Sequence, residues 1–315
     1  MTDKQQYKLL CELHPDVPLF AQYWYMECVC KGKEWNVILI RDGEGQIVAS
    51  MPYLLVNKYG MRAVMQPVLS QTNGVWIADA DHRSQEEKTN ICNAIIQKIS
   101  ELRLKWFFQN FDSRFDCFDP FLNAGFRLSQ RNTYVIEDIG DLQAVFAAFS
   151  AAKQRHIRKA ERNGLKVDWQ MQPGEFYDFH SQTLMQRGKV NHNSREVEVG
   201  LCQSALALGK GVIARITDTD GRTHAALFVV WHSDTAYYLI PATDERYKAS
   251  GASTLVVWET LKYLQGKVRR FDFEGSMIES VAHSYRQFGT AEVHYFQVEK
   301  ISSVFVKLWK LIHCK

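Results

Sequence analysis

Two carboxylates and a tyrosine in the last third of the chain have the side chains that acyl transfer to an amine requires. Asp272 and Glu274 alternate along a predicted strand over residues 270–274, so both carboxylates face the same side of it. Tyr285 follows on a short predicted helix. The transfer needs a base for the attacking amine and an acid for the leaving atom, and we predict Glu274 and Tyr285 in these roles. The alternatives are a capping or ion-paired Glu274 and a Tyr285 that only packs.

A loop of small residues precedes another predicted helix. The chain runs from a strand over 236–240, through a loop over 241–252, into a helix over 253–265 that Gly266 ends. Backbone N–H groups at such a helix start can bind phosphate or a developing oxyanion. An ordinary strand-to-helix turn would have the same sequence. We predict a phosphate-binding loop made of Lys248, Ser250, Gly251, Ala252 and Ser253.

A basic run over residues 153–162 has the spacing of a helix. Arg155, Arg158 and Arg162 recur three and four residues apart, so they share one face. We predict that Arg155 and Arg158 bind phosphate, the alternative being a solvated helix face. No serine, cysteine or histidine pattern matches a nucleophile motif, so the substrate amine is expected to attack directly. The cysteines also lack metal-site spacing, and we predict no metal.

The composition leaves the architecture open. With 315 residues, of which 46% are hydrophobic, the chain can form one large fold or two domains. A net charge of +3 means that contact with nucleic acid or a membrane must come from a local patch. No apolar run is long enough to span a membrane, and the cysteines are scattered. We expect a cytoplasmic protein whose apolar C-terminal helix, over 301–315, docks on its own core; peripheral membrane contact is the alternative.

An internal repeat favours two domains. A predicted hairpin over 35–56 corresponds to one over 212–231, with Val37 matching Ile213 at an offset of 176 residues. Further along, residues 107–134 match residues 271–298 at an offset of 164. We predict two α+β units, 1–136 and 137–315, the second carrying the C-terminal helix. Pro52 lies inside the second strand of the first hairpin, which predicts an edge strand or a bulge.

Two segments resemble a known family. Residues 153–167 contain Arg-His-Ile-Arg-Lys-Ala and, four positions on, Gly-Leu-Lys-Val, which resembles a basic stretch of the FemAB-like aminoacyltransferases. Phe-Asp-Phe-Glu-Gly-Ser over 271–276, followed by Tyr-Arg-Gln-Phe-Gly over 285–289, resembles the closing motif of that family. The resemblance covers mainly residues 133–300. It implies two tandem GNAT-like (acyl-CoA N-acyltransferase) domains, each with a mixed, mostly antiparallel sheet flanked by helices.

The resemblance also implies an activity: transfer of an aminoacyl or acyl group to an amine, with no tightly bound cofactor. The implied co-substrate is acyl-CoA or aminoacyl-tRNA. The implied acceptor is an amine on a peptidoglycan precursor, either a nucleotide-sugar peptide or a lipid-linked form, and tRNA is an implied partner. GNAT enzymes carry (Q/R)-x-x-G-x-(G/A) at the phosphate loop, and residues 248–253 here depart from it at both ends. The alternative is therefore a catalytically inactive GNAT-like protein that binds a nucleotide or a peptide.

Overall fold

A computed structural model describes residues 1–58, 60–303 and 306, and the chain forms two compact units. Unit 1 is Met1–Arg131 with His294–Lys315, and unit 2 is Asn132–Val293. These bounds differ from the predicted domains 1–136 and 137–315. Residues from 294 onward belong to unit 1 because the last strand, β12 (Ala291–Ile301), pairs with β5 (Trp106–Phe111) from Phe296 to Ile301. Most of the predicted C-terminal helix lies outside the described residues.

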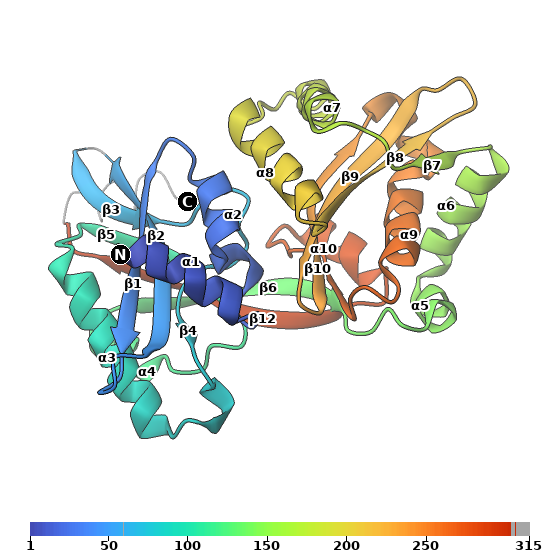
Figure 1. The fold of residues 1–315 in the computed structure, drawn as a ribbon. Coiled ribbons are helices and arrows are strands. Elements are labelled where there is room, and N and C mark those ends of the chain that lie inside the picture. Colours follow the sequence, from blue (N-terminus) through green and yellow to red (C-terminus); the bar gives the residue numbers. More distant parts are fainter. Residues whose placement is uncertain (59, 304–305, 307–315) are drawn as a thin grey trace. The chain divides into compact units, whose positions relative to one another are not determined.

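Unit 1 has helices against both faces of a mostly antiparallel sheet (Figure 1). Trp35 contacts Tyr7 of α1 on one face, whereas Ile38 lies in a core cluster with residues of α3 on the other. Its strand order is β1-β2-β3-β5-β12-β6, with β3 and β5 parallel. Its remaining elements are α1 (Asp3–Leu13), η1 (Leu19–Ala21), α2 (Tyr23–Val29), β1 (Glu34–Arg41), β2 (Ile47–Lys58), β3 (Met61–Met65), β4 (Trp76–Ile77), η2 (Ala80–His82), α3 (Gln85–Glu101), α4 (Asp119–Asn123) and the start of β6 (Arg127–Ile136).

Pro52 does not mark an edge strand, so that prediction was wrong. β2 pairs with β1 on one side and with β3 and β4 on the other. The β4 pairing involves Ala49 and Ser50, and the β3 pairing starts at Leu54, so Pro52 falls in the gap between them. Its carbonyl accepts a hydrogen bond from the Gln109 side chain at 2.9 Å. Because N–H and C=O groups of one strand residue point to the same side, the missing N–H of the proline also faces this gap.

Unit 2 repeats the arrangement of a sheet between two layers of helices (Figure 1). Its strand order is β12-β6-β11-β10-β9-β8-β7, in which β10 and β11 are parallel. It contains the end of β6, the start of β12, and α5 (Leu142–Ala148), α6 (Ala151–Arg162), β7 (Lys166–Asp168), α7 (Pro173–Gln186), α8 (Arg195–Ala207), β8 (Gly211–Thr217), β9 (Thr223–His232), β10 (Thr235–Thr243), η3 (Glu245–Ser250), α9 (Ala252–Leu264), β11 (Arg270–Asp272) and α10 (Glu279–Arg286).

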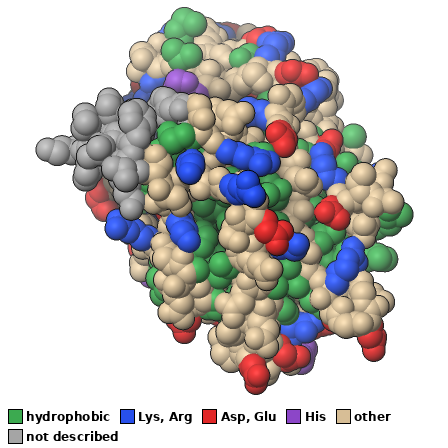
Figure 2. All heavy atoms as spheres, turned by 90° about the vertical axis from the view of Figure 1, so that its left-hand side faces the viewer, with side chains coloured by type: hydrophobic (Ala, Val, Ile, Leu, Met, Phe, Trp, Pro, Cys, Tyr) green, Lys and Arg blue, Asp and Glu red, His purple; other side chains and the backbone are tan. Residues whose placement is uncertain are grey.

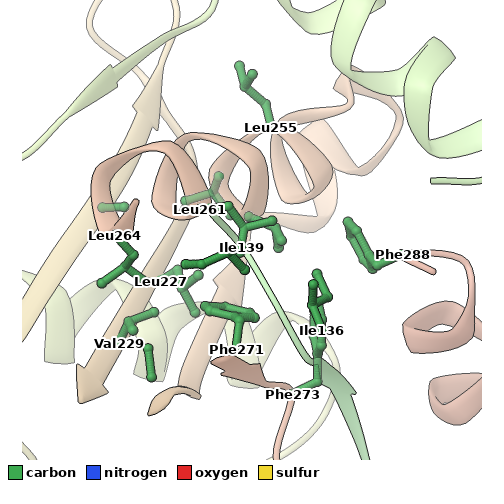
Figure 3. Close-up of a cluster of buried hydrophobic side chains, with 14 of the residues drawn as sticks. Ile136, Ile139, Leu227, Val229, Leu255, Leu261, Leu264, Phe271, Phe273 and Phe288 are labelled. Carbon is green, nitrogen blue, oxygen red and sulfur yellow. The ribbon is translucent and has the colours of Figure 1, made fainter. Parts of the chain in front are cut away.

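Both faces of the unit 2 sheet are buried. Leu227 and Val229 point toward α9 and join a core cluster with Leu261, as Figure 3 shows. The intervening Phe228 points the other way, and its ring centroid lies 6.3 Å from that of Phe176 in α7. Burial on both faces explains why residues 225–230 are continuously apolar rather than alternating.

The two hairpins have the same register, which confirms the internal repeat. Ala49 of β2 lies opposite Ile40 of β1, and Ala225 of β9 lies opposite Ile216 of β8, at the predicted offset of 176 residues. Each hairpin also has its irregularity directly after the isoleucine. The expected α+β fold, with mixed sheets flanked by helices, is therefore present in both units.

The turns of the two hairpins have the same chemistry. The carboxylates of Asp42 and Asp218 each accept hydrogen bonds from the backbone N–H groups two and four residues further on. Gly45 and Gly221 then take left-handed conformations, with φ of 83° and 77°. A side-chain cap followed by a left-handed glycine closes a hairpin of this length, so local sequence accounts for both turns.

Candidate active site

The chain turns sharply at the end of β11. Glu274 has φ of +60°, a left-handed conformation that costs a non-glycine residue about 1 kcal/mol or more. Gly275 follows with φ of +68°, and a Cβ atom there would lie 2.0 Å from the carbonyl oxygen of Asn132. The turn is thus pressed against β6. Backbone strain of this kind is concentrated at functional sites, which makes Glu274 a candidate.

The two carboxylates at this turn have different surroundings. Asp272 is buried, and its Oδ1 accepts hydrogen bonds from the Glu274 N–H at 2.7 Å and from the Thr133 hydroxyl. The Oε1 atom of Glu274 is also buried, but it has no hydrogen-bond partner in the described part of the chain. Burial, and next the charge of Asp272, raise the pKa of Glu274 well above its usual range. Asp272 is therefore held in place, whereas Glu274 has capacity for a proton and a ligand.

Tyr285 lies in the same cluster. Its ring centroid is 5.0 Å from that of Phe273 and 6.0 Å from that of Tyr238. Burial, followed by the nearby carboxyl groups of Glu274 and Asp272, raises the pKa of Tyr285 to about 12. The hydroxyl therefore stays protonated at neutral pH. The structure brings the two predicted catalytic residues together, and sequence analysis missed Tyr238, whose position in β10 gave no signal of its own.

The predicted phosphate loop is covered by α6. Gly251 has φ of +89°, and a Cβ atom there would lie 2.3 Å from the carbonyl oxygen of His156. On the same side, the Lys159 ammonium donates to the carbonyl oxygen of Ala249 at 2.7 Å. Close packing of α6 against the loop therefore requires a glycine at position 251, whether or not the loop binds phosphate.

The remaining loop residues are used unevenly. The Ser250 hydroxyl accepts from the Ala252 N–H at 3.2 Å, which occupies one donor at the helix start. The helix begins at Ala252 with Gly251 as N-cap, one residue before the predicted cap Ser253, which is exposed. Lys248 is 74% exposed in its side chain and lies 3.5 Å from Glu245.

The structure does not bring the predicted arginines to this loop. Both Arg155 and Arg158 are exposed on α6. Arg158 lies 3.3 Å from the Gln154 side-chain oxygen, and its guanidinium is 5.8 Å from the Phe146 ring centroid in α5. Among the described contacts, the cation of α6 that touches the loop is Lys159.

Lys153, at the start of the same helix, is buried, and sequence analysis treated it only as part of the basic run. It lies four residues before Ile157 and seven before Ala160, and all three side chains share the buried face. This helical spacing was the available signal, because it places Lys153 on the apolar side of α6.

Unit 1 lacks the acid–base pair. At the repeat offset of 164 residues, Asn110 takes the place of Glu274 and the buried Phe121 that of Tyr285. Unit 1 instead has a cavity of about 340 Å³ near η2, lined among others by Asp79, Asp81 and Trp76. The predicted site residues do not line it. Proton transfer by this pair is therefore confined to unit 2.

The described residues contain no helix that is long and apolar enough to cross a membrane, and no group of three side chains suited to holding a metal ion. On the face of the molecule in Figure 2, lysine and arginine side chains lie among acidic and apolar ones. That mixture agrees with the net charge of +3.

Comparison with known proteins identifies the fold. Residues 149–277 match the family model described as Acetyltransferase (GNAT) domain, a range that contains α6, the Gly251 loop and Glu274. No curated protein sequence matches the chain. A crystal structure of FemX is similar over 99% of this chain and 98% of its own, with a TM-score of 0.71 and 11% identity.

Two further solved structures are similar at low identity. The C-terminal domain of a putative lysylphosphatidylglycerol synthetase from Agrobacterium fabrum matches with a TM-score of 0.59 and 8% identity, over 99% of this chain and 95% of that one. A tandem GNAT protein from the clavulanic acid biosynthesis pathway matches with a TM-score of 0.53 and 11% identity, over 95% and 94%. The chain therefore contains a GNAT acetyltransferase domain and has the FemX-like tandem GNAT fold, which confirms the relation expected from sequence.

Proposed function

We propose that the protein is an N-acyltransferase that transfers an acyl or aminoacyl group to an amine, and that unit 2 carries out the chemistry. The observation that carries this proposal is the buried, unpaired carboxylate of Glu274 in a strained turn beside Tyr285. The match of residues 149–277 to the GNAT domain supports transfer of an acyl group as the reaction class.

In the proposed reaction the substrate amine attacks the carbonyl carbon of the donor. A C–N bond forms and the bond from that carbon to the leaving sulfur or oxygen breaks. Glu274, in its ionised form, accepts the proton that the amine loses, and its raised pKa makes it a stronger base than an ordinary carboxylate. Tyr285 is protonated at neutral pH and donates a proton to the leaving atom. Solvent then returns a proton from Glu274 to Tyr285.

The proposed donor is acyl-CoA or aminoacyl-tRNA, and both carry phosphate groups. We assign their binding to the loop of Lys248, Ser250, Gly251, Ala252 and Ser253, and to Arg155 and Arg158. The exposure of Lys248, Arg155 and Arg158 is consistent with this role. Replacing Lys248 or Arg158 with alanine should weaken donor binding without lowering the melting temperature. Equal losses of stability and binding would favour a purely structural role.

The proposed acceptor is an amine on a peptidoglycan precursor, as a nucleotide-sugar peptide or in lipid-linked form. The resemblance to FemAB-like proteins supports the first. The similar fold of the lysylphosphatidylglycerol synthetase domain supports a lipid-linked acceptor. Either acceptor is consistent with a cytoplasmic protein, which would work at the membrane surface when the acceptor is lipid-linked.

A turnover assay tests the function. Purified protein is supplied with acyl-CoA or aminoacyl-tRNA and with a UDP-sugar peptide, and the acylated amine is detected by mass spectrometry. The Glu274→Gln variant serves as the inactive control. Binding of a donor with no product from any acceptor would favour the second candidate, a GNAT-like protein that binds a nucleotide or peptide without turnover. The departures of residues 248–253 from the GNAT loop pattern favour that candidate.

A further inference from the structure

Lys153 is a buried cation at the edge of the unit 2 cluster. Only 9% of the residue is exposed, although lysine is almost never buried without a partner. Its ammonium donates to the Ser284 hydroxyl at 3.0 Å and lies 4.2 Å from the centroid of the Phe288 ring. Helix α6 therefore directs a charge into the protein rather than into solvent.

The described residues do not neutralise this charge. An ammonium has three N–H donors, and the Ser284 hydroxyl is the acceptor that the described part of the chain supplies. No carboxylate forms an ion pair with it there, and burial alone lowers the pKa of Lys153 to about 8. A buried ammonium with unused donors is costly for a folded protein unless a ligand supplies the missing acceptors.

The position of Lys153 connects it with the proposed chemistry. Its hydrogen-bond partner Ser284 directly precedes Tyr285 on α10. The Phe288 ring stacks on Phe273 with centroids 5.1 Å apart, and Phe273 precedes Glu274 in the chain. The ammonium thus lies against the same short helix and the same aromatic cluster as the two proposed catalytic residues.

We propose that Lys153 is the anion-binding residue of this site and that its ammonium binds a phosphate or carboxylate oxygen of a substrate. This inference rests on the proposed function for the identity of the site, but anion binding can be measured without turnover. It assigns to the buried face of α6 a role that sequence analysis gave to the exposed arginines. Phosphate and carboxylate offer the same oxyanion chemistry, and the test separates them.

The test is an NMR titration of the lysine side-chain signals at constant ionic strength. Lys153→Met identifies the Lys153 signal. Inorganic phosphate and acetate are added in separate arms against a sodium chloride background. We expect one of them to raise the pKa of Lys153, because a bound anion favours the charged form. His156 is the other titratable group for which the charge of Lys153 matters, since burial and then that charge lower its pKa, and its ring signals are followed separately. No change in the pKa of Lys153 beyond the chloride background in either arm would overturn the proposal.

Three variants separate binding from structure. Lys153→Met should abolish the thermal stabilisation by the active anion, whereas Lys166→Met, which removes an exposed lysine of β7, should keep it. Ser284→Ala removes the protein acceptor and should leave the anion effect in place. Equal stabilisation of Lys153→Met and wild type would contradict the inference. Anion binding without turnover would count against the proposed function alone, and turnover without anion binding dependent on Lys153 would count against this inference alone.

Discussion

Glu274 and Asp272 show how one type of side chain acquires different properties two residues apart. Asp272 accepts hydrogen bonds from a backbone N–H and from Thr133, so its carboxylate is already satisfied. Glu274 is held in a left-handed turn with a buried, unpartnered oxygen. Desolvation of a carboxylate raises its pKa, and the neighbouring charge adds to the effect. The alternation of carboxylates in the sequence suggested a pair, but only this packing distinguishes the two.

Glu274→Gln tests the base. The amide keeps the shape of the side chain but cannot accept the amine proton, so kcat should fall by about 10²–10⁴. The melting temperature should not fall, because an unpaired buried carboxyl is removed. Steady-state kinetics and a thermal melt measure both, with Glu279→Gln at the exposed start of α10 as the matched control. A loss of activity no larger than that of the control would remove Glu274 from the mechanism.

Lys153 predicts a pH dependence of stability. Its pKa is lowered from 10.5 to about 8 in the folded protein, so between these values the unfolded chain binds more protons. The free energy of unfolding should therefore rise with pH through this window, in total by on the order of 1–3 kcal/mol, and the cost should be fully present below pH 8.

Urea unfolding of wild type and Lys153→Met across this pH range measures the effect. Their difference cancels the titration of other groups, and the wild type should gain on the variant as the pH rises. Parallel curves would mean that the ammonium is not desolvated in the folded state.

At the scale of elements, the packing of α6 against α9 depends on one backbone position. Gly251 combines a left-handed φ with a carbonyl oxygen of His156 directly over its Cα. Gly221, in the β8–β9 turn, is also left-handed, but nothing lies within 4 Å of the position of its Cβ. The pair separates conformational strain from steric conflict.

Gly251→Ala should lower the free energy of unfolding by about 2–4 kcal/mol, because α6 must move away from the loop. Gly221→Ala should cost about 1 kcal/mol, the price of a left-handed alanine alone. Chemical denaturation of both variants measures the difference. Equal costs would show that α6 accommodates the methyl group without strain, and that close packing does not explain the glycine.

At the scale of the molecule, unit 1 is built from both ends of the chain. The end of β12 pairs with β5, and Trp106 donates to Glu299 at 2.8 Å. Deleting residues 294–315 should therefore destabilise unit 1 and spare unit 2. In hydrogen exchange measured by mass spectrometry, β5 and β3 should lose protection by more than tenfold, while β9 and α9 keep theirs. Earlier loss of protection in β9 would instead support a second domain that extends to residue 315.

The sequence by itself determined the features that depend on neighbouring residues. The aspartate and glycine of each hairpin turn act locally, so the repeat could be found from a constant offset, and the Gly-rich end of β11 marked the region of Glu274. Only the tertiary structure decided the burial of Lys153, the contact of Gly251 with α6, and the unit to which β12 belongs. These depend on segments that are distant in sequence, and helical or strand periodicity does not say which partner covers a given face.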